Sequence, residues 1–382
     1  MRNIVLFTLF CSSLFAGGYK IPETSLNSVA LSAANVAHAW GADAAYYNPA
    51  NMVFMKNEAV VEANLMYIGL SDINYKAAGI DINSKRENFV VPTLHYVSQE
   101  ISGARYGLSI VSPAGLSKRW QSAPAIYSAE EFTLQTVEIN PSVALPIGDK
   151  IAVALGIRAI YSEGVVKRSP PGVSLDMNGD SIDIGYNLAL SYKASPELEM
   201  ALAYRSKVDL SVEGDVSLNT LKSNASVSIP VPALLNIAVA YTLPSKTTFE
   251  FVYERNFWSE YKELDFDFGQ GLPDPAPIAK NWRDTDTFRF GITQKLEKLT
   301  LMGGLLIDES PTPNETLGFE LPDSDSFSVS FGARYQVSEK INVGIGALYS
   351  VREDKKVSNG SLEGEFSNAN ALLISSALEY RF

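Results

Sequence analysis

Side chains along much of this chain alternate between apolar residues and small or polar ones, as in a β-strand with two different faces. Segments such as 182–192, 233–242 and 327–337 hold this alternation for ten residues or more. Strands of soluble proteins usually run for ~5–6 residues, whereas a tilted strand that crosses a membrane needs ~9–11. No stretch after the first sixteen residues reaches the ~18 consecutive apolar residues of a membrane-spanning helix. A chain of this kind can therefore enter a membrane only as a closed β-barrel, in which every strand edge is paired.

The connections between these strands alternate in length. Short turns, such as 148–149, 195–196 and 244–245, alternate with long segments rich in Pro, Gly, Asp and Ser at 113–130, 167–179, 214–225, 260–283, 310–323 and 354–368. Short turns at one end and long loops at the other are typical of bacterial outer-membrane barrels. We therefore predict an all-β fold, a transmembrane antiparallel barrel of about fourteen strands over residues 58–382, located in the outer membrane.

The N-terminal 57 residues have a different composition. Residues 1–16 have a basic start, an apolar run from Ile4 to Phe15 and a small residue at Ala16, which predicts an export signal peptide. It contains Cys11, the only cysteine. Residues 17–57 are rich in Ala and Ser, and we expect them to form short helices in a hatch that plugs the lumen. A flexible periplasmic arm is the alternative.

Composition argues against several other functions. The net charge is −12, whereas nucleic-acid binding requires clustered Lys and Arg. The two histidines, His38 and His95, are far apart, and the sequence has no nucleophile elbow, phosphate loop or zinc-binding motif. We therefore expect no enzyme activity, metal or cofactor.

Six short segments resemble one known family, the FadL/TodX outer-membrane transporters of long-chain fatty acids and hydrocarbons. They are Asn48-Pro49-Ala50, the segment 112–116 followed by Trp120, and the segments 140–144, 204–208, 308–313 and 321–325. The resemblance implies a fourteen-stranded barrel with an N-terminal hatch marked by Asn48-Pro49-Ala50. It also implies a hydrophobic ligand that enters among the loops, passes to an internal site and leaves sideways at a kink in the third strand.

The third predicted strand is Gly103 to Ser112, and we expect the kink and lateral gate at Gly103 and Gly107, because glycine in a strand often marks a bend. The alternative is that Gly107 makes room for the hatch. The resemblance also implies basic residues that hold a ligand carboxylate near the outer end of the fifth strand and before the tenth. The nearest positions are Arg158 or Lys167, and Lys280 or Arg283. Pairing within the protein is the alternative.

Five apolar residues in one long loop are candidates for an outer ligand groove; packing against one another is the alternative. They are Leu264, Phe266, Phe268, Leu272 and Trp282.

The predicted function is outer-membrane transport of hydrophobic compounds, most of all long-chain fatty acids, by a monomer surrounded by membrane lipid and lipopolysaccharide. A porin-like or structural barrel is the alternative, and an outer-membrane hydrolase is a weaker one.

Overall fold

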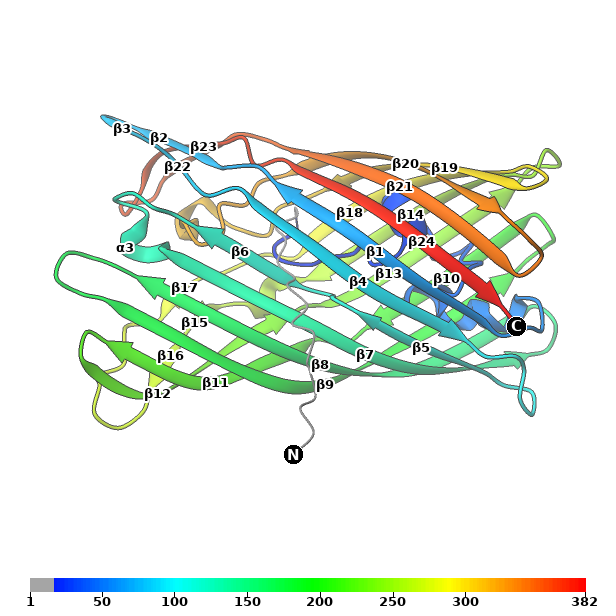
Figure 1. Cartoon of the computed structure of the whole chain (residues 1–382), viewed down its shortest axis with the longest axis horizontal. Coiled ribbons are helices and arrows are strands. Elements are labelled where there is room, and N and C mark those ends of the chain that lie inside the picture. The colour runs from blue at the N-terminus through cyan, green and yellow to red at the C-terminus, as the bar shows by residue number, and fades with distance from the viewer. Residues whose placement is uncertain (1–16) are drawn as a thin grey trace.

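The computed structural model describes residues 17–382, so the predicted signal peptide lies outside the described residues. Fourteen antiparallel strands surround a lumen (Figure 1), and three of them are interrupted, so that each of these consists of two consecutive segments. In order they are β1 (Val60–Leu70), β4 (Glu87–Val97), β5 (Arg105–Val111) with β6 (Gly115–Arg119), β7 (Glu131–Ile147), β8 (Ile151–Arg168), β9 (Leu175–Lys193), β10 (Leu198–Arg205) with β11 (Val208–Leu218), β12 (Leu221–Val231) with β13 (Ala233–Thr242), β14 (Thr247–Phe257), β18 (Thr285–Lys295), β19 (Leu299–Asp308), β20 (Ser326–Gln336), β21 (Ile341–Arg352) and β24 (Ala371–Arg381).

The sheet closes between its first and last strands. β1 pairs with β24 along its whole length, from Val60 opposite Arg381 to Leu70 opposite Ala371. Closure removes the free strand edges that lipid cannot hydrogen-bond. Tight turns and the C-terminus lie at one end of the barrel (right in Figure 1), which we call the turn end, and the longer connections lie at the other, the loop end.

The two faces of the wall are inverted relative to a soluble protein. Large apolar side chains point outward, for example Ile182 and Phe331, which are 71% and 67% exposed. Small and polar side chains such as Ser328 and Ser330 point inward and are buried. The alternation in the sequence therefore separates a lipid face from a lumen face, and the predicted barrel is confirmed.

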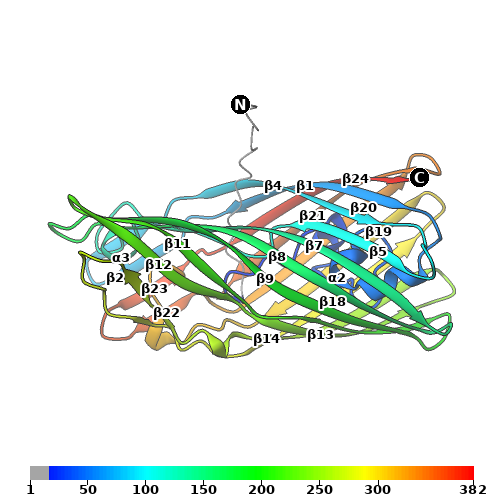
Figure 2. The same cartoon turned by 90° about the horizontal axis from the view of Figure 1, so that it is seen from below.

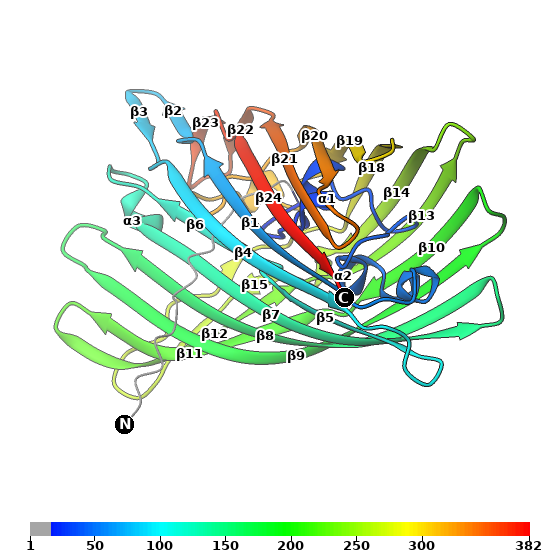
Figure 3. The ribbon, with the colours of Figure 1, turned by 45° about the vertical axis from the view of Figure 1, so that its right-hand side comes forward.

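Residues 17–57, which we call the hatch, lie inside the barrel (Figures 2 and 3) and contain α1 (Leu26–Ala30), α2 (Ala44–Tyr47) and the 3₁₀-helix η1 (Pro49–Phe54). Ser25 and Ser28 form a capping box at the start of α1. Small residues allow close packing of hatch and wall, since a Cβ on Gly332 would lie 2.5 Å from the Cβ of Ala30. Among residues 17–382, no helix is long and apolar enough to cross a membrane.

Short elements cover the loop end. They are β2 (Asn74–Ala77), β3 (Ile80–Asn83), α3 (Ile126–Ala129), η2 (Trp258–Glu260), β15 (Glu263–Leu264), β16 (Phe266–Phe268), β17 (Ile278–Ala279), η3 (Asn314–Thr316), β22 (Lys355–Ser358) and β23 (Glu363–Ser367). β22, β23, β2 and β3 form a separate small sheet, and Tyr75, Phe319 and Phe366 pack beneath it with Trp120.

The prediction of long loops at two places in the sequence is wrong. Most of 167–179 and 214–225 is strand. β9 continues beyond the part of the wall with apolar side chains on its outer face, and it pairs there with both β8 and β11. Polar composition suggested loops, but backbone pairing between neighbouring strands does not require apolar side chains.

The expected position of the kink is also wrong. β5 runs without interruption through Gly107, which pairs with Val97 on one side and Ser142 on the other. Gly103 lies in the preceding turn at φ +80°. The interruption falls at 112–114, between β5 and β6, where Pro113 supplies no N–H for the ladder. Gly107 instead makes room for the hatch: an added Cβ would lie 2.8 Å from both Ala45 Cβ and Met52 Sδ.

Candidate functional site

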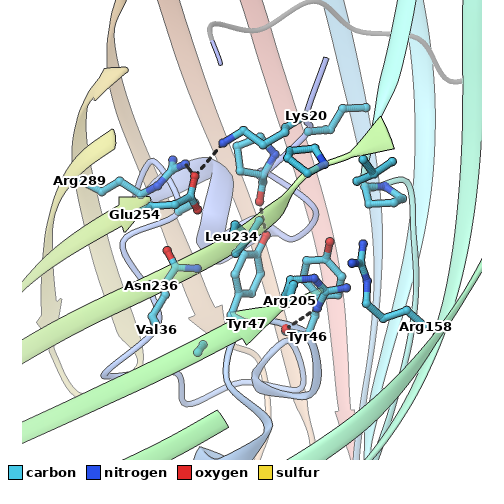
Figure 4. A pocket seen from close by; sticks show the side chains of 17 residues that line it. Lys20, Val36, Tyr46, Tyr47, Arg158, Arg205, Leu234, Asn236, Glu254 and Arg289 are labelled. Carbon is cyan, nitrogen blue, oxygen red and sulfur yellow. Dashed lines mark hydrogen bonds and ion pairs between the residues drawn. The ribbon is translucent and has the colours of Figure 1, made fainter. Parts of the chain in front are cut away.

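A cavity of about 60 Å³ lies in the lumen between the hatch and the wall (Figure 4), and we call it the inner cavity. The hatch contributes Tyr46 and Tyr47, and the wall contributes Leu234 and Asn236. Tyr47 is fixed in place because its hydroxyl donates to Pro22 O at 2.6 Å. The cavity therefore depends on the position of the hatch.

Cations that line the inner cavity already face carboxylates. Lys20 Nζ lies 2.8 Å from Glu254 Oε1, and Arg289 Nη2 lies 3.2 Å from the same oxygen. Arg158 and Arg205 share Glu138, with Arg158 Nη2 at 3.0 Å from Glu138 Oε2. All these side chains are buried, so each charge requires its partner.

Arg158, a candidate for the ligand carboxylate, thus lines the cavity but has its donors engaged. Besides Glu138, its guanidinium donates to Ser206 O at 2.6 Å. Ser206 lies at the interruption between β10 and β11, so Arg158 satisfies a carbonyl beside the broken ladder. This matches the alternative of pairing within the protein.

Two smaller apolar cavities lie between the inner cavity and the loop end. They measure about 40 and about 20 Å³, and Phe132 and Ile229 line both. The smaller one is bordered by Tyr19, which directly precedes Lys20 and Ile21 of the inner cavity. The three cavities therefore form a succession from the loops to the hatch.

The five apolar loop residues proposed for an outer groove are brought together. All five are buried in one hydrophobic cluster. Phe266 lines the 40 Å³ cavity and Trp282 the 20 Å³ cavity. Leu264, Phe268 and Leu272 pack behind them and line none of the three cavities.

Of the other basic candidates, Lys280 reaches a cavity. It lines the 20 Å³ cavity, which we call the Lys280 cavity, and forms an ion pair with Glu320. Lys167 is 38% exposed and pairs with Glu131 and Asp176 at 3.5 and 3.6 Å. Arg283 is exposed and donates to Ser310 O at 3.5 Å. The structure therefore places Lys167 and Arg283 away from the three cavities.

Sequence reasoning missed Arg168 and Glu320. The Arg168 guanidinium lies 5.7 Å from the centre of the Phe266 ring. Within residues 17–382 it has no carboxylate within ion-pair distance, although it directly follows the candidate Lys167. Burial raises the pKa of Glu320, but the ion pair with Lys280, a backbone N–H and the charge of Arg168 together bring the pKa below its ordinary value.

The wall has a gap in its hydrogen-bond ladder at the interrupted third strand. β4 pairs with β5 over Leu94–Val97, and near the loop end Lys85 N donates to Arg119 O at 2.8 Å. Between these points, within the part of the chain that the structure describes, no backbone pairing joins residues 86–93 to residues 111–118. We call this gap the wall window.

The hatch covers the wall window from inside. On one edge, Ile21 N donates to Pro113 O and Gly115 N donates to Tyr19 O, both at 2.9 Å. On the other edge, Thr93 Oγ1 donates to Thr24 O at 2.8 Å. The segment 19–24 therefore contacts both edges of the gap.

The Asn48-Pro49-Ala50 motif lies outside the segment 19–24 that covers the wall window. Asn48 Nδ2 donates to Val36 O at 2.7 Å and to Ser191 Oγ at 2.9 Å, so the motif ties two parts of the hatch together and to β9.

Solved structures and curated proteins of similar sequence are outer-membrane proteins. A Pseudomonas aeruginosa FadL homologue superimposes with a TM-score of 0.87 at 16% identity, covering 95% of this chain and 99% of that one. The Ralstonia pickettii toluene transporter TbuX gives 0.75 at 17% identity, covering 94% and 98%. The long-chain fatty acid transport protein of Escherichia coli O6:H1 is 24% identical over 348 residues, which is 75% of this chain and 76% of that protein.

A family model matches residues 7–382 and so covers nearly the whole chain. The chain therefore belongs to the outer membrane protein transport protein family (OMPP1/FadL/TodX), whose members are transporters of the outer membrane and not enzymes.

Proposed function

We propose that this protein imports long-chain fatty acids across the outer membrane, as a monomer in the lipid and lipopolysaccharide of that membrane. The observation that carries the proposal is the succession of three cavities from loops to hatch, walled by aromatic and aliphatic side chains and bordered by Lys280. Apolar walls suit an acyl chain, and a buried cation suits its carboxylate through charge-assisted hydrogen bonds. The fatty acid transport proteins among the relatives support the same cargo.

An uncharged hydrocarbon is the second candidate. It is favoured by the cations of the inner cavity, which are already neutralised by Glu254 and Glu138 and leave no free charge for a carboxylate. A toluene transporter is among the similar structures.

The cargo leaves sideways in this proposal, through the wall window and into the membrane. Release into water would cost ~0.8 kcal/mol per CH₂, on the order of 10 kcal/mol for a long acyl chain. A path through the wall avoids that cost, but a closed sheet can open only where ladder bonds are missing. The position of segment 19–24 across the gap implies that the hatch must move to let the cargo out.

A reversible tether between hatch and wall tests this proposal. Thr24→Cys with Thr93→Cys places one thiol on each of two residues that are in contact across the gap, since Thr93 Oγ1 now donates to the backbone oxygen of Thr24 at 2.8 Å. Uptake of radiolabelled palmitate by cells should exceed that of empty-vector cells, fall when the pair is oxidised, and recover on reduction. The single-cysteine variants are the controls and should not respond to oxidant. Unchanged uptake with the tether formed would refute this route, and no uptake by the wild type would refute the cargo.

A further inference from the structure

Buried hydrogen-bond donors without acceptors lie in and around the Lys280 cavity, and one of them, the indole N–H of Trp282, belongs to its lining. Trp282 is 4% exposed, and its indole N–H finds no acceptor within residues 17–382. The same is true of Trp258, whose ring centroid lies 4.8 Å from that of Trp282. Arg168 lines none of the three cavities, but its Nε is also buried without a partner among the described residues, and its guanidinium lies over the Phe266 ring. A buried donor without an acceptor is unfavourable, so a ligand in the Lys280 cavity that brings an acceptor oxygen to Trp282 would bind more favourably.

One carboxylate, that of Glu320, lines the same cavity as Trp282 and Lys280. Glu320, from the loop after β19, reaches Lys280, from the loop after β14, and the side chains are 16% and 5% exposed. Lys280 is the only other residue within 17–382 with which the Glu320 side chain forms a hydrogen bond. Although burial raises the pKa of Glu320, the ion pair with Lys280 and smaller contributions from a backbone N–H and Arg168 lower it below its ordinary value, so Glu320 is charged at neutral pH. Its contact with Lys280 thus neutralises a cation that would otherwise be buried alone.

Resting on the transport function proposed above, we propose that Glu320 stands in the place of the ligand's carboxylate and is exchanged for it when a fatty acid enters the Lys280 cavity. The empty cavity then keeps its charge balanced, and an anionic ligand must compete with Glu320 for Lys280. An uncharged ligand of equal length forms no ion pair with Lys280, so Glu320 does not change its binding affinity. Glu320 therefore weakens the binding of fatty acids selectively, which favours their onward release.

Equilibrium binding to the purified full-length barrel in detergent tests the exchange. The probes are palmitate and hexadecanol, which have the same chain length and differ in charge. Glu320→Gln keeps the shape of the side chain and removes the competing charge. It should bind palmitate roughly tenfold more tightly, as expected for one charge-assisted hydrogen bond, and hexadecanol as the wild type does.

Two further variants serve as controls. Glu315→Gln removes the same charge from an exposed position of the same loop and should change neither affinity. Glu320→Gln with Lys280→Met removes both charges and should abolish the gain for palmitate. Retarded migration of the unheated protein in a denaturing gel shows that each variant has folded.

The possible results separate the exchange from the transport function. A folded Glu320→Gln protein that binds palmitate no more tightly, or binds both ligands more tightly by the same factor, overturns the exchange. Transport then still stands if cells carrying the wild type take up palmitate. A wild-type protein that binds neither ligand contradicts both.

Discussion

Glu250 on the wall holds the hatch through three backbone hydrogen bonds. Its carboxylate accepts from Val36 N and Ala37 N at 2.6 Å and from His38 N at 3.2 Å. Hydrogen bonds within a protein each contribute about 0.5–1.5 kcal/mol. Glu250→Ala would leave two buried N–H groups and one partly buried N–H group without an acceptor, so we expect a loosened hatch and larger ion currents in planar bilayers.

Glu250→Gln is the matched variant, because its amide retains one acceptor oxygen. Its current should lie between those of the wild type and Glu250→Ala. A folded Glu250→Ala barrel with wild-type current would show that these bonds do not hold the hatch.

At the level of single residues, the sequence identified candidate ligand-binding residues better than it identified the residues that contact them. Lys280 and Trp282 were identified as ligand candidates and do lie together at one cavity. Glu320 was missed because it reaches Lys280 from another loop, 40 residues away. The lumen position of Arg158 follows from strand alternation, whereas its pairing with Glu138 depends on the register of β7 and β8, which alternation does not specify.

At the level of elements, the contact between β5 and the hatch depends on Gly107. Its absent side chain leaves room for Ala45 and Met52, each 2.8 Å from a Cβ at that position. Gly107→Val should push the hatch out of place, at a cost of about 1–3 kcal/mol for overpacking, and limited proteolysis should then cut the hatch faster than in the wild type.

Gly103→Asn is the control for that substitution. Gly103 has φ +80° with nothing within 4 Å of an added Cβ, and Asn tolerates such a backbone. Its proteolysis should match the wild type. Equal cleavage of the wild type and a folded Gly107→Val protein would contradict the packing role.

Strand number could be read from the sequence, but strand irregularities could not. Alternation predicts the lipid-facing part of each strand because lipid requires apolar side chains there. Beyond the membrane this requirement ends, and β8, β9 and β11 continue as paired strands that looked like loops. The interruption at Pro113 and its contact with Ile21 depend on the hatch, which pairs with the wall across more than 90 residues of sequence.

For the whole molecule, plugging of the lumen is the property that separates a carrier from a porin. Fourteen strands enclose a lumen wide enough for water, and wide barrels without a plug conduct. The hatch fills that lumen with buried side chains from Tyr19 to Met52. Deletion of residues 17–57 should therefore raise single-channel conductance severalfold, measured on purified barrels in planar bilayers. A current that stays at the wild-type level would contradict the plug.

Transport of hydrophobic cargo is tested most directly by comparing two kinds of solute in the same cells. Cells without their own fatty acid transporter would express this protein, and the entry of radiolabelled palmitate and of a small labelled sugar would be measured side by side. We expect palmitate entry severalfold above that of empty-vector cells, with no gain for the sugar. Equal gains for sugar and palmitate, or no gain for palmitate, would contradict that expectation.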